Sequence, residues 1–234
     1  MCKTDYIRIL CWRCSKNKHW KCIFGVNLEF PKIDLTHTLH AEQAAITNAW
    51  NAGEERIEKL AVTYIPCALC RQFITELDGA KSIQIILESK EYSMAELLPY
   101  AFGPDDLGND TRLMTPHSNN LMSKYNDSDE LIIKAVDAAD NSYSPYAQSY
   151  SGVALQTDDG AVITGRYAEN IAFNISMNPM EGALSNLNLY NKSFSSISRA
   201  VIVEPEANQI SQITAAKKIL SSVNSNVSLE VVRI

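Results

Sequence analysis

An internal repeat limits what this 234-residue sequence can fold into more than any other feature. With an offset of 139 residues, the apolar stretch 60–66 aligns with 199–205, and both stretches end in proline. The same offset aligns Glu42 with Glu181 and Ala44 with Ala183. A chance similarity is the alternative, and the retained proline and glutamate count against it. We therefore expect two copies of one fold in a single chain.

Apolar periodicity predicts strands that alternate with helices in both copies. Strand-like runs cover residues 22–28, 60–65, 82–87, 152–156, 161–165, 199–203 and 229–234. Helix-like runs cover residues 40–51, 67–77, 128–139, 180–190 and 209–222. The stretch 104–127 is rich in Asn, Asp and Ser and is typical of a connection. The sequence therefore predicts an α/β protein with a first unit at 1–107, a linker at 108–127 and a second unit at 128–234.

The first copy has no visible counterpart for the helix that opens the second copy. That helix, at 128–141, precedes the strand that starts at Gly152, and the offset places its equivalent before residue 3. Residues 3–14 do not resemble residues 142–153. Either the chain is truncated at its start, or this segment replaces the usual one. We expect an incomplete or altered N-terminus in the first unit.

One histidine and two cysteines are candidate metal ligands. His40 is followed by Glu42, and Cys67 and Cys70 lie downstream, directly after Pro66. His40 opens one predicted helix, while the two cysteines open another and, three residues apart, share a face of it. Catalytic zinc sites keep three protein ligands and leave the fourth position for water. Glu42 is then free to transfer protons rather than to bind the metal.

Other interpretations of these residues stay open. A C-x-x-C pair also occurs as a redox pair or as half of a structural zinc site. His37 lies three residues before His40 and competes as a ligand, but no glutamate follows it two positions later. Glu42 also suits the first turn of a helix, where a carboxylate interacts favourably with the helix dipole.

The second copy does not retain the metal ligands. The offset of 139 places Pro179, Glu206 and Gln209 at the three ligand positions. Proline has no side-chain donor for zinc. We therefore expect one Zn²⁺ per chain, held by the first unit.

Charge and apolar content exclude several classes of partner. The formal net charge is −6 and no Lys/Arg stripe occurs, which argues against nucleic acid because phosphate binding depends on clustered cations. No apolar run approaches the length of a membrane span, and residues 1–20 do not match a signal peptide. All six cysteines lie before residue 71, and we expect a reducing cytoplasm in which thiols stay free. A small neutral substrate is compatible with this composition.

The N-terminal segment suggests a second metal site. Cys11, Cys14, His19 and Cys22 have a spacing close to that of a zinc knuckle. The spacing matches no pattern that we can assign, so we favour ordinary thiols in a divergent N-terminus. The sequence assigns no role to Cys2.

A histidine with a glutamate two positions later, followed by P-C-x-x-C, is the known signature of zinc nucleobase deaminases. From about residue 24 to residue 234, the chain resembles the dimeric type of bacterial cytidine deaminase. The matching segments are residues 24–30, 40–46, 66–73, 98–104 and 167–174. The resemblance implies a three-layer α/β/α cytidine deaminase-like fold with a mixed sheet, duplicated in the chain. It also implies a homodimer, a catalytic first unit and a second unit without a zinc site.

The resemblance also implies substrate contacts. Asn27 and Glu29 match positions that hydrogen-bond the ribose, chiefly its 3′-hydroxyl, although from the residues alone they indicate a polar strand end. Phe102 matches an aromatic residue that one subunit places over the active site of its partner; alone it would be a core phenylalanine. Tyr64 is expected to line the same pocket, with packing in a buried strand as the alternative.

The chain departs from the family at its front. Members of the family carry a small helical domain, and then a helix and a strand with a Ser-Pro-(Phe/Tyr) segment. Residues 1–21 stand in their place. This departure puts the stability and activity of the first unit in doubt.

The leading hypothesis is zinc-dependent deamination of cytidine and deoxycytidine to uridine and deoxyuridine, with release of ammonia, in pyrimidine salvage. One alternative is a deaminase of cytosine nucleotides or polynucleotides, for which Arg71 is the only obvious phosphate ligand. The other alternative is an inactive, zinc-bound remnant that serves as a dimerising scaffold. The acidic charge disfavours the first alternative, and the intact set of zinc ligands with Glu42 disfavours the second.

Overall fold

Two compact units make up the chain. The computed structural model describes residues 6–12, 20–125 and 128–234. The first unit contains Met1–Leu28, Leu39–Thr115 and Asn170–Ser176, and the second contains Glu29–Thr38, Pro116–Glu169 and Met177–Ile234. Each half of the sequence therefore contributes one short segment to the unit that is built mainly from the other half.

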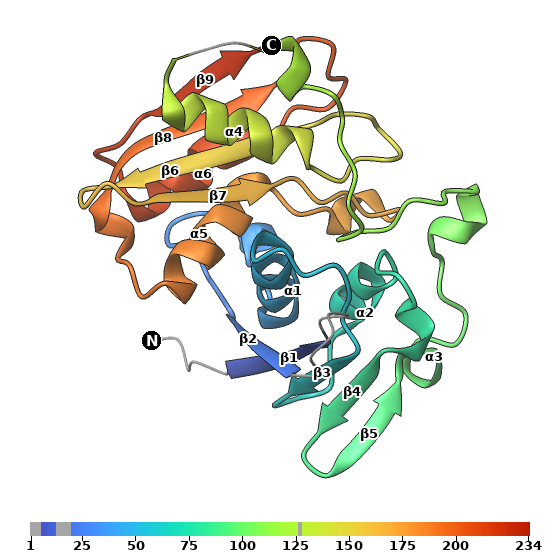
Figure 1. Ribbon diagram of the computed structural model, residues 1–234. Helices are drawn as coiled ribbons and strands as arrows, with labels where there is room; N and C mark the ends of the chain where they lie inside the picture. Colours follow the sequence, from blue (N-terminus) through green and yellow to red (C-terminus); the bar gives the residue numbers. More distant parts are fainter. Residues whose placement is uncertain (1–5, 13–19, 126–127) are drawn as a thin grey trace. The chain divides into compact units, whose positions relative to one another are not determined.

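The first unit contains a mixed sheet with the strand order β2-β1-β3-β4-β5 (Figure 1). Its strands are β1 (Tyr6–Trp12), β2 (Trp20–Val26), β3 (Lys59–Val62), β4 (Gln84–Leu87) and β5 (Lys90–Ser93). Its helices are α1 (Ala41–Asn51), α2 (Ala68–Ile74) and α3 (Met94–Leu97). β3 and β4 are parallel and α2 connects them, whereas the other neighbouring strands are antiparallel.

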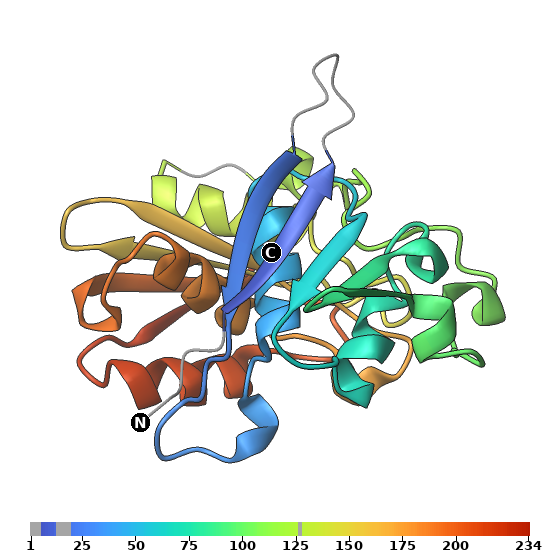
Figure 2. The ribbon, with the colours of Figure 1, turned by 90° about the horizontal axis from the view of Figure 1, so that it is seen from below.

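Helix α1 packs directly on the backbone of β2. A Cβ atom at Gly25 would overlap the carbonyl oxygen of Ala41 and the amide nitrogen of Ala45, so only glycine allows this approach. Nearly every residue of α1 is buried, from Ala41 to Trp50. In Figure 2 the two blue strands, β1 and β2, lie in front of this helix. The close contact fixes where the first turn of α1 begins.

The second unit is a three-layer α/β/α structure. Its sheet has the order β7-β6-β8-β9, with strands β6 (Gly152–Thr157), β7 (Val162–Arg166), β8 (Ile197–Glu204) and β9 (Leu229–Arg233). Its helices are α4 (Glu130–Asp140), α5 (Pro179–Leu189) and α6 (Ile213–Val223). Gly152 touches the backbone of α4, while Gly165, paired with Val153 across the ladder, touches the backbone of α5. Because Gly152 and Val153 point to opposite faces, α4 and α5 cover opposite faces of the sheet.

The two units repeat the same strand pairing. Ile7 lies opposite Gly25 on β2, as Val153 lies opposite Gly165 on β7. β1 therefore occupies the position of β6, although residues 3–14 show no resemblance to residues 142–153. The expected duplication is confirmed in the backbone, where sequence identity had failed to reveal the first strand.

The single offset of 139 is wrong by one residue at α1 and α5, and by six residues between Cys67 and Gln212, the N-caps of α2 and α6. The glycine contacts pair Ala41 with Pro179 and Ala45 with Ala183, an offset of 138. His40, the residue before α1, therefore corresponds to Asn178, the residue before α5. The physical reason is that loops of different length separate the strand and the helix in the two copies, so no single offset holds.

Three elements of the first unit were not predicted from the sequence. β5 is an exposed edge strand with the sequence KEYS, which has no apolar alternation, and α3 has only four residues. A Ser93–Glu96 capping box starts α3, and this pattern was the available signal. β1 lies in the segment that we interpreted as a divergent N-terminus.

The structure does not test the second metal site that Cys11, Cys14, His19 and Cys22 suggested, for which we favoured ordinary thiols. Cys14 and His19 lie outside the described residues, Cys11 lies in β1, and Cys22 is an exposed free thiol. Cys2 also lies outside the described residues. None of the helices in the described ranges is long and apolar enough to cross a membrane.

Gly25→Ala tests the contact between β2 and α1. The added methyl group overlaps the helix backbone, so we expect the free energy of unfolding to fall by about 1–3 kcal/mol or more. Urea unfolding followed by circular dichroism measures the loss. Gly165→Ala is the matched control, because it creates the same overlap with α5 in the second unit. Both variants lose stability, but only Gly25→Ala is expected to weaken zinc binding; equal zinc affinity in the two variants would contradict the link between β2 and His40.

Candidate metal centre

The start of helix α1 places His40. His40 is the N-cap residue, with an extended backbone at φ −73° and ψ 151°. Its backbone N–H donates to the side-chain oxygen of Gln43 at 3.2 Å, and its carbonyl accepts from the amide of Ala44 at 2.9 Å. These backbone contacts hold the first turn. The imidazole of His40 is therefore available to bind a metal.

The start of helix α2 places Cys67 and Cys70. Cys67 is the N-cap residue, and Cys70 is the third residue of the helix. Residues at these two positions lie on the same side of the first turn. Both thiols therefore lie at the N-terminus of the same helix.

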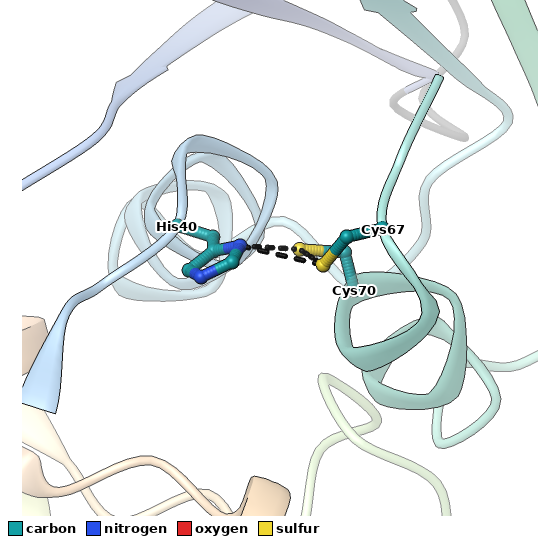
Figure 3. Close-up of side chains that lie close together, drawn as sticks. All are labelled: His40, Cys67 and Cys70. Atoms are coloured by element: carbon teal, nitrogen blue, oxygen red, sulfur yellow. Dashed lines mark hydrogen bonds between the residues drawn. The ribbon is translucent and has the colours of Figure 1, made fainter. Parts of the chain in front are cut away.

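The three side chains converge in the first unit (Figure 3). His40 Nδ1 lies 3.4 Å from the Sγ atom of each cysteine, and the two sulfurs are 3.7 Å apart. Tetrahedral zinc, with bonds of about 2.3 Å to sulfur and 2.0–2.1 Å to nitrogen, separates two sulfurs by about 3.8 Å and sulfur from nitrogen by about 3.6 Å. In the part of the chain that the structure describes, no other group of three His, Cys, Asp or Glu side chains is as close. The donor set and its spacing fit Zn²⁺.

The surroundings of Cys70 favour its neutral thiol when no cation lies beside it. Cys70 is 1% exposed, and burial raises the pKa of its thiol far above the ordinary value, with a further contribution from the charge of Glu42. A thiolate here therefore needs a positive charge beside it, which a bound zinc ion supplies. Cys67 is exposed and His40 is half-buried, so the ligand group is accessible from one side.

Glu42 lies beside the ligands. It is the second residue of α1 and is 8% exposed. Its Oε2 atom accepts a hydrogen bond from the Cys70 thiol at 3.3 Å. The spacing His40-x-Glu42 thus places a buried carboxylate next to the metal ligands, as the sequence predicts.

The second unit has an amide contact where the first unit has its ligands. Asn178 is the N-cap of α5 and Gln212 is the N-cap of α6, the positions that correspond to His40 and Cys67. The Asn178 Nδ2 atom donates to the backbone carbonyl and to the side-chain oxygen of Gln212, at 3.1 Å each. Hydrogen bonds between two amides therefore join the two helix starts that a metal would join in the first unit.

The four predicted substrate contacts differ in their surroundings. The bridge between Leu28 and Leu39, with hydrogen bonds of 2.9 and 3.0 Å, places Asn27 opposite His40. Glu29 is exposed and belongs to the segment Glu29–Thr38 of the second unit. Tyr64 is 71% exposed and Phe102 is 47% exposed. Neither aromatic side chain is therefore a core residue, although their roles toward a substrate stay predictions.

His37 does not join the ligand group. Its Nδ1 atom lies 3.8 Å from Glu181 in the second unit. The nearby carboxylate of Glu181 raises the pKa of His37, although burial opposes the shift. His37 therefore lies beside a carboxylate within the second unit, in line with its interpretation as a loop histidine rather than a ligand.

Sequence reasoning missed the role of Arg71. Its Nε atom donates to the carbonyl of Pro66 at 2.7 Å and its Nη1 atom to the carbonyl of Leu97 at 3.0 Å. The guanidinium thus fixes the residue before Cys67 relative to the end of α3. Arg71 lies four residues after Cys67, and nothing in the sequence indicated this contact.

His40→Ala tests the metal centre. Loss of a residue that supports a metal ligand typically lowers metal affinity about 10–100-fold. Removal of one of the three ligands should lower zinc affinity at least as much. Metal analysis of the purified protein should find about one zinc ion per wild-type chain and almost none in the variant. His37→Ala is the matched control and should keep its zinc. A His40→Ala protein with full zinc content would rule out this site.

The comparisons with known proteins agree with this centre. Two models of the family described as "Cytidine and deoxycytidylate deaminase zinc-binding region" match residues 11–86 and 94–217. A cytidine deaminase of Shewanella halifaxensis is 45% identical over 210 residues, which cover 89% of this chain and 70% of that protein. A cytidine deaminase of Photorhabdus laumondii is 44% identical over 200 residues, which cover 85% of this chain and 67% of that protein.

Solved structures give weaker matches. The crystal structure of cytidine deaminase from Burkholderia pseudomallei is 22% identical, with 42% of this chain and 77% of that chain covered and a TM-score of 0.38. The cytidine deaminase of Mycobacterium tuberculosis is 20% identical, with 45% and 85% covered and a TM-score of 0.39. Superpositions at these scores add nothing about the fold. The two family models and the extent of the curated matches establish that this chain belongs to the cytidine deaminase family of zinc-binding enzymes.

Proposed function

We propose that this chain catalyses hydrolytic deamination of cytidine and deoxycytidine to uridine and deoxyuridine, with release of ammonia, in pyrimidine salvage. The observation that carries the proposal is the position of Glu42. Its carboxylate is buried and lies 3.3 Å from Cys70 Sγ, yet it is not one of the three converging ligands. A carboxylate held beside a metal without binding it can accept and return protons. The 45% identity to proteins named cytidine deaminase supports the substrate class.

The reaction needs one group that acts first as a base and then as an acid. His40, Cys67 and Cys70 would hold the zinc ion, which when bound supplies a water with a pKa near about 7. Glu42 accepts a proton from this water as the water oxygen attacks C4 of the cytosine ring, and then delivers that proton to N3. Glu42 transfers the second proton to the amino group, which leaves as ammonia when the C4–N bond breaks. The oxygen stays as the carbonyl of uridine.

Substrate contacts are assigned to four side chains. Asn27 and Glu29 bind the ribose hydroxyls, because an amide both donates and accepts while a carboxylate accepts. Tyr64 lines the pocket beside the zinc ligands. The backbone bridge that places Asn27 opposite His40 supports the first assignment, and the 71% exposure of Tyr64 leaves its ring available for contact.

Phe102 is assigned to the active site of a partner subunit in a homodimer. Its side chain is 47% exposed, and that of Tyr100 is 97% exposed. Exposed aromatic side chains near one another are typical of protein interfaces. This exposure supports the dimer that the family resemblance implies.

The nucleotide and polynucleotide alternative is disfavoured by Arg71. Its guanidinium donates to two backbone carbonyls, and these bonds hold it at the ends of α2 and α3. The net charge of −6 also opposes a polyanion. A nucleoside without phosphate is therefore the substrate class that we propose.

The proposed domains follow the two halves of the sequence, although the compact units exchange residues 29–38 and 170–176 between these halves. We propose a catalytic unit at 1–107, a linker at 108–127 and a degenerate unit at 128–234. The amide contact of Asn178 with Gln212 supports a second unit without zinc. We also propose a reducing compartment, the cytoplasm, as the location, because cysteines outside a metal site keep free thiols there.

Glu42→Ala tests the assigned chemistry. Loss of the proton-transfer group should lower the rate of ammonia release from cytidine by about 10²–10⁴-fold, while zinc content stays unchanged. Glu55→Ala, which removes an exposed carboxylate, is the control and should leave both values unchanged. Cytidine, cytidine monophosphate and a cytosine-containing single strand should be compared as substrates. Wild-type protein that holds zinc but releases no ammonia would favour the inactive scaffold instead.

A mixture of two inactive variants tests the role of Phe102. Phe102→Ala and Glu42→Ala homodimers should both be impaired. In a mixed dimer, the subunit with Phe102→Ala keeps its own Glu42 and receives an intact Phe102 from its partner, so activity should return at one of the two sites. If mixing restores no activity although subunit exchange is demonstrated by mass spectrometry, Phe102 does not act across the interface.

A further inference from the structure

Helix α2 carries two of the three zinc ligands and is too short to hold them alone. It has seven residues, from Ala68 to Ile74. Isolated helices below about 12–15 residues are marginal in water, so tertiary contacts must set the direction of this helix. The positions of Cys67 and Cys70 therefore depend on what holds the two ends of α2.

The start of α2 is held from within the first half of the sequence. The guanidinium of Arg71 joins the carbonyl of Pro66, directly before Cys67, to that of Leu97 at the end of α3. This contact fixes the approach to the N-cap. It does not fix the other end of the helix.

The end of α2 is held by a segment from the second half of the sequence. Asn170–Ser176 belongs to the first unit, although the chain around it belongs to the second. The Asn170 Nδ2 atom donates to the carbonyl of Gln72 at 3.1 Å. The amide of Ile171 donates to the carboxylate of Glu76 at 2.7 Å. Asn170 and Glu76 are both 0% exposed, so neither bond is shared with bulk water.

Two further contacts make this end of α2 a junction. The carbonyl of Glu76 accepts from the amide of Leu113 at 2.8 Å. The side chain of Gln72 donates to the carbonyl of Phe102 at 2.6 Å. One helix end thus joins the segment from the second half to the segment that carries the proposed interface residue. Loss of a hydrogen-bond partner for the buried Glu76 carboxylate would cost free energy, so these bonds hold the end of α2 in one direction.

We propose that Asn170 and Glu76 are positioning residues for the zinc centre, and that the second half of the chain supplies the segment that aligns the cysteine helix. They act through α2, not on the substrate. This inference rests on the proposed function in one respect: the zinc centre that α2 aligns is the proposed catalytic centre. It gives the degenerate half a function: without zinc ligands of its own, it orients those of the first half.

The test measures the rate at which a coloured chelator removes zinc from the folded holoenzyme. Loss of contacts that support metal ligands typically lowers metal affinity about 10–100-fold. Glu76→Ala and Asn170→Ala should therefore release zinc at least about tenfold faster than wild type. Glu76→Gln keeps an oxygen that accepts from Ile171 and should release zinc at nearly the wild-type rate. Asn174→Ala, which removes an exposed side chain of the same segment, should leave the rate unchanged.

A stability control separates alignment from general loosening. Val201→Ala removes core volume in the second unit and should lower the melting temperature without faster zinc release. If Val201→Ala speeds zinc release as much as Asn170→Ala does, at an equal loss of stability, the positioning role is refuted. If Asn170→Ala does not fold, Asn170→Asp replaces it, since this change keeps the oxygen that accepts from Ala172 and puts a carboxylate oxygen in place of the donor to Gln72.

The readout does not depend on cytidine. Wild-type protein that binds zinc but does not deaminate cytidine would refute the proposed function and leave the release comparison valid. Conversely, unchanged release from Glu76→Ala and Asn170→Ala in an active enzyme would refute the positioning role alone. In the active enzyme, kcat should fall more than KM rises, because the misplaced group is the metal centre.

Discussion

The convergence of two helix N-termini is the constraint on which the rest of the first unit depends. His40 precedes α1 and Cys67 precedes α2. Their donor atoms must lie close enough together to bind one tetrahedral zinc ion. Gly25 lets α1 rest on the backbone of β2, and Arg71 fixes the entry to α2. The sheet, the glycine contact and the arginine contact thus serve one geometric requirement.

The second unit repeats the architecture of the first with hydrogen bonds at the matching helix starts. The same close contact occurs between Gly165 and α5, and the two helix starts are joined by the amides of Asn178 and Gln212. Neutral hydrogen bonds of this kind contribute about 0.5–1.5 kcal/mol each, and the buried sheet and helices provide the remaining stability. The second unit therefore keeps this architecture without the three ligand residues of the first unit. This independence explains how one copy can lose its ligands and keep its backbone.

The sequence predicted the parts of the protein that have local signals. The pattern of His40, Glu42, Cys67 and Cys70 predicted side chains that lie close together, because residues near helix starts have a fixed spacing. β5, with the sequence KEYS, was missed because it shows no apolar alternation, whereas β1 is an apolar run that was assigned to a divergent N-terminus. The contact of Asn170 with Gln72, residues 98 positions apart, has no local signal. The errors in the repeat offset arose because loop lengths differ between copies, which an alignment without gaps cannot represent.

The exchange of segments makes the two halves interdependent. Glu29–Thr38 packs in the second unit, where His37 meets Glu181 in the first turn of α5. Asn170–Ser176 packs in the first unit, where Asn170 and Ile171 meet the end of α2. Each exchanged segment lies between a matching pair of bridge residues, Leu28 with Leu39 and Ala168 with Met177. Because each unit needs a segment from the other half, a degenerate copy cannot be lost without loss of contacts at the zinc helix. Selection on the catalytic copy therefore also acts on the copy that has no ligands.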